Sequence, residues 1–316
     1  MSFDRAIMVD WSAAASIGPA TPTKDRCWLA CADRATPEAS RPPAEYFRTR
    51  HACMARVDEL CAACPGRVLV GFDFPLGYPE WVHDMQNNPG ALPVAGELCA
   101  WLAGHLTDSC DGKTNRFEVA ADINRRLHLQ SGGPLWGRPV STNAPGVTVC
   151  RPPVVHPEFR LVEQALQSEG RRPHSCFKLY TAGSVGSQML TGLAALGRWR
   201  ASGTGASRRV RLWPFETRWA AHTGKTDVVV AEIWPSLYST QHQPGPCRDA
   251  KQVVAARNAI MKLADPFRAP TVPGATVLAA ALACEGWVLG VQELRGMAIP
   301  AFPETRARRI RITRGC

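Results

Sequence analysis

The sequence has no long apolar segment. A membrane-spanning helix needs about 18 to 20 consecutive apolar residues, whereas the longest apolar runs here are short ones such as Val277 to Cys284. Met1 to Val9 include an aspartate and lack the hydrophobic region of a signal peptide. These absences predict a cytoplasmic protein without membrane association.

Motifs of several common enzyme classes are missing as well. Cys61-x-x-Cys64 has no second pair and none of the eight histidines belongs to a His-x-x-x-His pair, so zinc is not indicated. Gly203-x-Gly205 is followed by Arg208 where a dinucleotide-binding fingerprint has glycine or alanine. There is no Walker motif, and Ala182 stands where a nucleophile elbow has its first glycine. A zinc enzyme, a Rossmann enzyme and a serine hydrolase are therefore disfavoured.

The composition is that of a folded chain of enzyme size. The 316 residues are 45% hydrophobic and 20% charged, which predicts one large domain over 1–316. The twelve cysteines are scattered and predict reduced thiols. The 37 Lys and Arg residues exceed the 27 Asp and Glu residues, which gives a net charge of +10. The arginines at 208–211 and 306–314 favour a nucleic-acid partner, although the second group also fits a solvated tail.

The first third of the chain has the pattern of an α/β sheet. Short apolar runs predict four strands, and a helical apolar period predicts one helix before the fourth strand. The strands are expected at Ala6–Val9, Cys27–Cys31, Glu45–Arg50 and Val68–Phe72, and the helix at His51–Cys64. The helix allows a crossover that makes the fourth strand parallel to the first. Asp10 and Asp73 would then emerge together at one edge of the sheet.

Residues 78–209 are expected to form a mostly helical insertion, because Pro, Gly and Trp interrupt the sheet pattern there. Strand patterns return at Val210–Trp213 and Val228–Ile233, and Glu232 lies at the end of the second. Asp249 then opens an amphipathic helix, and an apolar helix is expected at Ala275–Trp287.

Four acids therefore stand at predicted strand or helix ends: Asp10, Asp73, Glu232 and Asp249. Carboxylates from separate elements suit Mg²⁺ or Mn²⁺, and two such ions would clamp both oxygens of a phosphodiester displacement. Each acid also has a structural alternative, such as a turn cap for Asp10 or an N-cap for Asp249. Glu232 is harder to explain structurally, because a charge after an apolar strand needs a partner.

Four sequence blocks carry a resemblance to a known family. They are Val9-Asp10-Trp11-Ser12, Gly71-Phe72-Asp73-Phe74-Pro75-Leu76-Gly77, Ala231-Glu232-Ile233-Trp234-Pro235-Ser236-Leu237, and Asp249-Ala250 before an alanine-rich helix. In this order, from Asp10 to Ala256, they resemble the predicted RNase H-fold nucleases of unknown function. The resemblance implies an RNase H-like mixed sheet, of strand order 3-2-1-4-5, flanked by helices. Some similar sequences carry molybdopterin- or cobalamin-biosynthesis labels, which no residue here supports.

The resemblance also implies roles for the four acids. It assigns Asp10, Asp73, Glu232 and Asp249 as catalytic metal ligands, one acid from each block. The family often has a denser aspartate pattern at the last position, so Glu285 is an alternative fourth ligand.

Two further groups are candidates from the residues themselves. Lys178, Ser184 and Ser187 lie in or beside a small-residue segment ahead of a predicted helix, where backbone N–H groups can hold a phosphate. The alternative is a glycine-rich turn that only lets the helix pack. Glu216 follows another strand and Pro, and it is either a reserve ligand or the partner of a nearby arginine.

These observations predict a Mg²⁺- or Mn²⁺-dependent nuclease that hydrolyses phosphodiester bonds of nucleic acid. One alternative is a nucleotide-dependent phosphotransferase or ATPase of the same fold, with residues 181–187 on the phosphates. The other is a nucleic-acid-binding module with a degenerate site.

Overall fold

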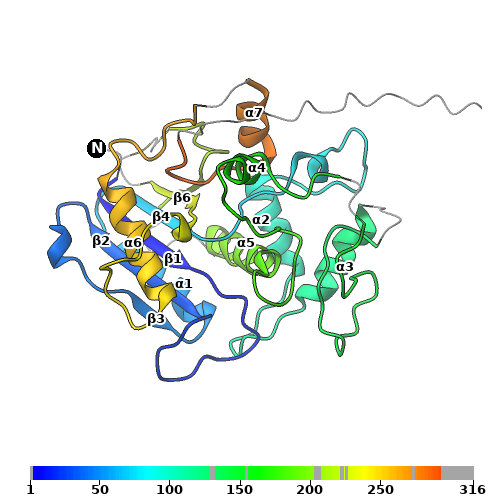
Figure 1. The fold of residues 1–316 in the computed structure, drawn as a ribbon, viewed down its shortest axis with the longest axis horizontal. Coiled ribbons are helices and arrows are strands. Elements are labelled where there is room, and N and C mark those ends of the chain that lie inside the picture. Colours follow the sequence, from blue (N-terminus) through cyan, green and yellow to red (C-terminus); the bar gives the residue numbers. More distant parts are fainter. Residues whose placement is uncertain are drawn as a thin grey trace, which may run out of the picture.

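A computed structural model describes residues 3–127, 132–153, 156–202, 208–220, 224, 227–271 and 275–292. It is a mixed α/β structure with one six-stranded sheet. Figure 1 shows α6 crossing in front of β1 and β2, and the helices α2, α3 and α5 on the side away from β3. No helix in the described part of the chain is long and apolar enough to cross a membrane.

The sheet is built as the first third of the sequence predicts. Its strands are β1 (Arg5–Asp10), β2 (Cys27–Asp33), β3 (Glu45–Phe47), β4 (Val68–Phe72), β5 (Val210–Leu212) and β6 (Val228–Glu232). The pairs β1–β2 and β2–β3 are antiparallel, whereas β1–β4, β4–β6 and β6–β5 are parallel. The helix between β3 and β4 gives the crossover that a parallel pair needs.

The strand order differs in detail from the expected five-strand order 3-2-1-4-5. The observed order is β3-β2-β1-β4-β6-β5, so the later strand, β6, lies against β4 and the three-residue β5 takes the edge. β6 is buried along its whole length, and a central place in the sheet covers both of its faces.

The helices follow the predicted pattern with shifted ends. They are α1 (Arg50–Ala62), α2 (Ala95–His105), α3 (Arg116–Arg126), α4 (Leu161–Ser168), α5 (Val185–Ser202), α6 (Arg248–Lys262) and α7 (Ala275–Ala280), which continues as a π-helix over Ala281–Glu285. The short 3₁₀ turns are η1 (Glu38–Ser40), η2 (Glu80–His83) and η3 (Pro235–Leu237). Helices α2 to α5 all lie within 78–209, between β4 and β5, so the expected insertion region is helical where described.

Side chains alternate between two apolar cores on the two faces of the sheet. Val9, Phe72 and Val230 belong to one core, together with residues of α1, α2 and α5; we call this side the α5 face. Met8 and Leu69 belong to the other, with residues of α4, α6 and the 277–291 segment, and we call it the α6 face. Because successive strand residues point to opposite faces, the position of an acid in its strand decides which face it meets.

Trp11 fixes the chain directly after β1. Its fully buried indole packs edge-on against Phe72 and Phe74, and its Nε1 donates a hydrogen bond to Thr191 Oγ1 of α5 at 3.0 Å. Gln188 Nε2 donates to the Trp11 carbonyl oxygen at 2.5 Å. These contacts join α5 to the end of β1 and hold that end in place.

Candidate functional site

Asp10 and Asp73 lie side by side at the carboxyl ends of two neighbouring parallel strands. Val9 is paired with Phe72 in the β1–β4 register, so the two aspartates directly follow a matched pair. The Asp73 N–H donates to the Val9 carbonyl at 3.2 Å, and Asp73 Oδ1 accepts a hydrogen bond from the Trp11 N–H at 2.6 Å. By strand alternation both side chains are on the α6 face.

The Asp10 carboxylate has no partner among the described residues. No described residue donates a hydrogen bond to it, and neither Asp10 nor Asp73 makes an ion pair with a described residue. Both side chains are only partly buried, so they remain open to solvent or to an ion. A carboxylate in this situation has no protein cation that offsets its cost of desolvation.

Burial and like charge disfavour ionisation at this pair. Burial raises the pKa of Asp10 well above its usual value, and the charges of Asp73 and Asp249 raise it further. Burial also raises the pKa of Asp73 to about 7, although the Trp11 N–H opposes the shift, and the Asp249 charge adds to it. A bound cation would oppose both effects, because it favours the charged form of both acids.

Asp249 belongs to the same region but is held separately. It lies in the first turn of α6, and its Oδ2 accepts a hydrogen bond from the Asp25 N–H at 2.7 Å. The N-cap of α6 is Cys247, so Asp249 is not the cap residue that its sequence context also allowed. Its carboxylate is near enough to raise the pKa of Asp10 by repulsion.

Glu232 meets a different set of residues. It follows Val230 by two positions, so it alternates with Asp73 across the sheet, although its charge still raises the pKa of Asp73. Its Oε1 and Oε2 accept hydrogen bonds from Arg160 Nη2 at 2.7 Å and Nη1 at 2.8 Å. The Leu76 N–H donates to Oε2 at 3.4 Å. Glu232 is therefore part of a buried bidentate ion pair.

Arg160 is the centre of a buried cluster that we call the Arg160 cluster: Arg160, Glu163, Glu232 and Glu285. Besides Glu232, Arg160 donates to Glu163 Oε1 at 2.8 and 3.1 Å and to the Glu285 carbonyl oxygen at 2.9 Å. Glu285 accepts backbone N–H bonds from Glu80 at 2.9 Å and Leu161 at 2.6 Å. Burial nevertheless raises the pKa of Glu285 to about 7. The cluster ties α4 and the end of the π-helix to β6.

The expected four ligands thus divide into two groups. Asp10, Asp73 and Asp249 share one region, whereas Glu232 and Glu285, the proposed alternative to Asp249, both lie in the Arg160 cluster. Within the described ranges, no three His, Cys, Asp or Glu side chains are arranged to hold a metal ion. Of the expected ligands, Asp10 and Asp73 are the two that follow neighbouring parallel strands. Mg²⁺ is commonly bound by only one or two carboxylates together with water and substrate phosphates.

The expected phosphate contacts are engaged within the chain. Lys178 Nζ donates to the Ala182 carbonyl at 2.6 Å and lies 5.9 Å from the ring centre of Trp136. The buried Ser187 hydroxyl donates to the Leu179 carbonyl at 2.6 Å. Ser184 precedes α5, and its carbonyl accepts the Ser187 N–H. These contacts are those of a turn that packs the start of α5.

Glu216 pairs with an arginine, as its structural alternative allowed. Its Oε1 accepts from Arg200 Nη2 at 2.7 Å and its Oε2 from the Leu212 N–H at 2.9 Å. The basic residues 306–314 lie outside the described residues. The cysteines of the described part are all free.

Two structurally important residues were not singled out by sequence reasoning. Arg160 precedes a helix in a region of weak pattern, and nothing in its sequence neighbours marks it as buried. Trp11 entered only as part of the Val9-Asp10-Trp11-Ser12 block, although its backbone N–H positions Asp73. A backbone donor carries no signal in the sequence.

Comparisons of the chain with protein-family models, with curated proteins and with solved structures give no significant match.

Proposed function

We propose that this protein is a Mg²⁺- or Mn²⁺-dependent phosphodiesterase that acts on nucleic acid, built on an RNase H-like sheet. The observation that carries the proposal is the Asp10–Asp73 pair: two adjacent carboxylates at parallel strand ends, with no cation from the described residues. Open α/β sheets bind their ligands at this edge. The antiparallel β1–β2–β3 unit followed by the parallel β4 is consistent with the RNase H-like arrangement.

The chain's own groups would prepare the site for an ion. The Trp11 N–H fixes Asp73 Oδ1, and the indole of Trp11 is itself locked by Thr191 and Phe72, so Asp73 has a set orientation. The oxygens of the Asp10 carboxylate accept no hydrogen bond from a described residue. Asp249 is held by the Asp25 N–H and adds negative charge nearby, which increases the attraction for a cation. A divalent ion bound there would polarise the phosphoryl oxygen and supply a nucleophilic water.

Glu232 has no place among the ligands in this proposal. Its two oxygens are already bonded to Arg160, and breaking a buried ion pair would leave an uncompensated charge. We assign it instead to holding β6 beside β4 beneath the site.

The test is a nuclease assay with Mg²⁺ or Mn²⁺ on labelled DNA and RNA. Asp10→Asn and Asp73→Asn keep the shape of each side chain and remove its charge, and each should lower the hydrolysis rate by at least about 100-fold. Asp122→Asn on α3, which removes a charge from a surface ion pair with Arg125, is the matched control and should leave the rate unchanged. Equal activity in all four proteins would reject the proposal.

The alternatives have less structural support. A phosphotransferase would need Lys178 and Ser187 on a nucleotide, and both bond to backbone carbonyls instead. ATP binding measured by calorimetry would favour that reading. Metal-independent nucleic-acid binding that survives loss of both aspartates, without hydrolysis, would favour the degenerate binding module.

A further inference from the structure

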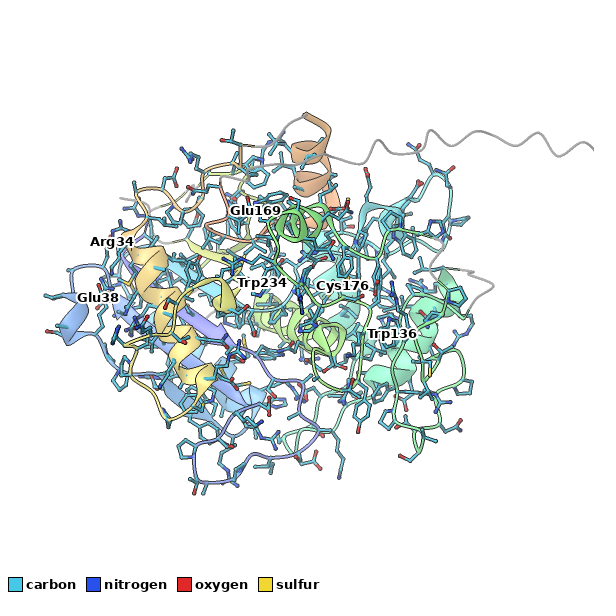
Figure 2. The ribbon with its side chains drawn as sticks, in the orientation of Figure 1. Arg34, Glu38, Trp136, Glu169, Cys176 and Trp234 are labelled. Carbon is cyan, nitrogen blue, oxygen red and sulfur yellow. The ribbon has the colours of Figure 1, made fainter. Side chains whose placement is uncertain are left out.

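A polar groove lies along the first turns of α6. Its volume is about 570 Å³, and it is bounded by the segment 236–242 on one side and by Arg248, Lys251 and Gln252 of α6 on the other. Figure 1 shows this connecting segment, in yellow, beside α6, and Figure 2 labels Trp234 directly before it, between α6 and the insertion helices. We call this feature the α6 groove.

The charge of the α6 groove is positive. Arg248 and Lys251 line it, and no carboxylate is among its described lining residues. Neither Arg248 nor Lys251 forms an ion pair within the described ranges. Asp249, although adjacent in sequence, turns away to accept the Asp25 N–H. Two cations that no described residue pairs favour an anionic ligand.

The remaining lining fits a phosphate and sugar rather than a base. Ser236, Ser239 and Thr240 supply hydroxyl groups, which hydrogen-bond phosphate oxygens and sugars. Tyr238 contributes the groove's aromatic ring, whereas strands held by base stacking run over several aromatic rings. The chemistry is that of contact with a nucleic-acid backbone, which carries no sequence preference.

The start of α6 adds to this attraction. Cys247 is its N-cap and makes no side-chain capping bond, so no side chain at the cap takes up the first N–H groups of the helix. The positive end of a helix dipole favours a nearby anion. Alone this would be weak, but it acts on the same groove as Arg248 and Lys251.

The α6 groove begins within one helical turn of Asp249, at the start of α6. Arg248 and Lys251 flank Asp249, whose charge is felt by Asp10, and one turn of helix advances about 5.4 Å. We propose that the α6 groove binds the phosphodiester backbone of a nucleic-acid strand through Arg248 and Lys251, next to the phosphate that lies at Asp10 and Asp73. This inference rests on the proposed nuclease function for its substrate class.

The test measures binding without catalysis. Fluorescence anisotropy with labelled single-stranded DNA and RNA of one sequence, in EDTA, is followed between about 50 and 200 mM salt. Arg248→Ala/Lys251→Ala should weaken binding roughly tenfold and reduce the slope of log K against log salt by about 1.4, that is about 0.7 for each lost phosphate contact. Both residues are on the surface side of α6, and circular dichroism checks that the variant is folded.

The matched control is Lys113→Ala/Arg125→Ala, which removes the same charge from exposed residues outside the groove. It should change binding less than about twofold. If the two double variants lose equal affinity, or if neither loses any, the α6 groove is not a backbone site. Should the wild type fail to bind either strand, the inference is equally overturned.

The result is separable from the proposed function. Hydrolysis that requires Asp10 but ignores Arg248 and Lys251 would overturn the groove alone. Binding that requires Arg248 and Lys251, from a protein that hydrolyses nothing, would uphold the groove and reject the nuclease.

Discussion

The end of this sheet carries two groups of acids that differ in their source of positive charge. In the Arg160 cluster, three glutamates surround a guanidinium that donates to two of their carboxylates. Around Asp10 and Asp73, no described residue supplies a cation. The first group has its counter-charge within the fold, whereas the second has none from the described residues. The comparison teaches that an acid at a strand end is a ligand candidate only if the fold has not already paired it.

Burial explains why the two groups behave differently. Arg160 is fully buried and its charge is retained because bidentate contacts to Glu232 and Glu163 replace its lost water. The aspartate pair keeps partial contact with solvent. Its cost of ionisation appears instead as raised pKa values for Asp10 and Asp73.

The largest expected effect on stability comes from removing the buried cation, Arg160. Arg160→Met leaves Glu163, Glu232 and Glu285 buried without counter-charge, so the free energy of unfolding at pH 8 should fall by about 3–5 kcal/mol. Urea unfolding measures it. Lowering the pH toward 5 should restore part of the loss, because the glutamates then take up protons. A loss below about 1 kcal/mol would mean that Arg160 does not hold the cluster together.

A smaller effect should appear at the aspartate pair. An acid whose pKa is raised on folding binds more protons in the folded state, so the free energy of unfolding falls as pH rises from about 4 toward the folded pKa. For Asp73 this window ends at about pH 7. In EDTA at pH 8, Asp10→Asn should therefore be more stable than wild type, because the pKa of Asp10 is raised on folding.

Magnesium should reverse that ranking. Excess Mg²⁺ stabilises the folded form that binds it, by about 2.7 kcal/mol at a hundredfold excess over Kd, and should act on wild type but not on Asp10→Asn. Thermal unfolding of both proteins, with and without Mg²⁺, measures these stabilities. If Asp10→Asn is less stable in EDTA and Mg²⁺ acts on both proteins alike, the aspartate pair is not an ion site.

The smallest expected effect on stability is at an exposed ion pair. Comparing it with Arg160 distinguishes the contribution of burial from that of charge. Arg125 pairs with Asp122 at 2.6 Å on the surface of α3, as close as the contacts of Arg160. Arg125→Gln should change the free energy of unfolding by less than about 0.5 kcal/mol, because water screens the exposed pair. A change as large as that of Arg160→Met would show that charge alone, without burial, accounts for the difference.

The sequence reached the Asp10–Asp73 pair through local pattern. Short apolar runs, a helical period over α1 and the rule for crossovers were enough to place β4 parallel to β1 and the two acids at one edge. The same reasoning grouped Glu232 with them, because β6 is a continuous apolar run. Such a run has no polar alternation that shows which face its last residue meets.

The sequence by itself determined the mixed sheet, the strand ends and the acids that stand there, since these depend on the spacing of apolar residues along a short stretch of chain. Only the tertiary structure decided that Arg160 reaches Glu232 across 72 positions and that no described cation reaches Asp10. The physical reason is that a buried ion pair depends on which distant side chains the fold brings into contact. The spacing of apolar residues does not indicate which side chains those are.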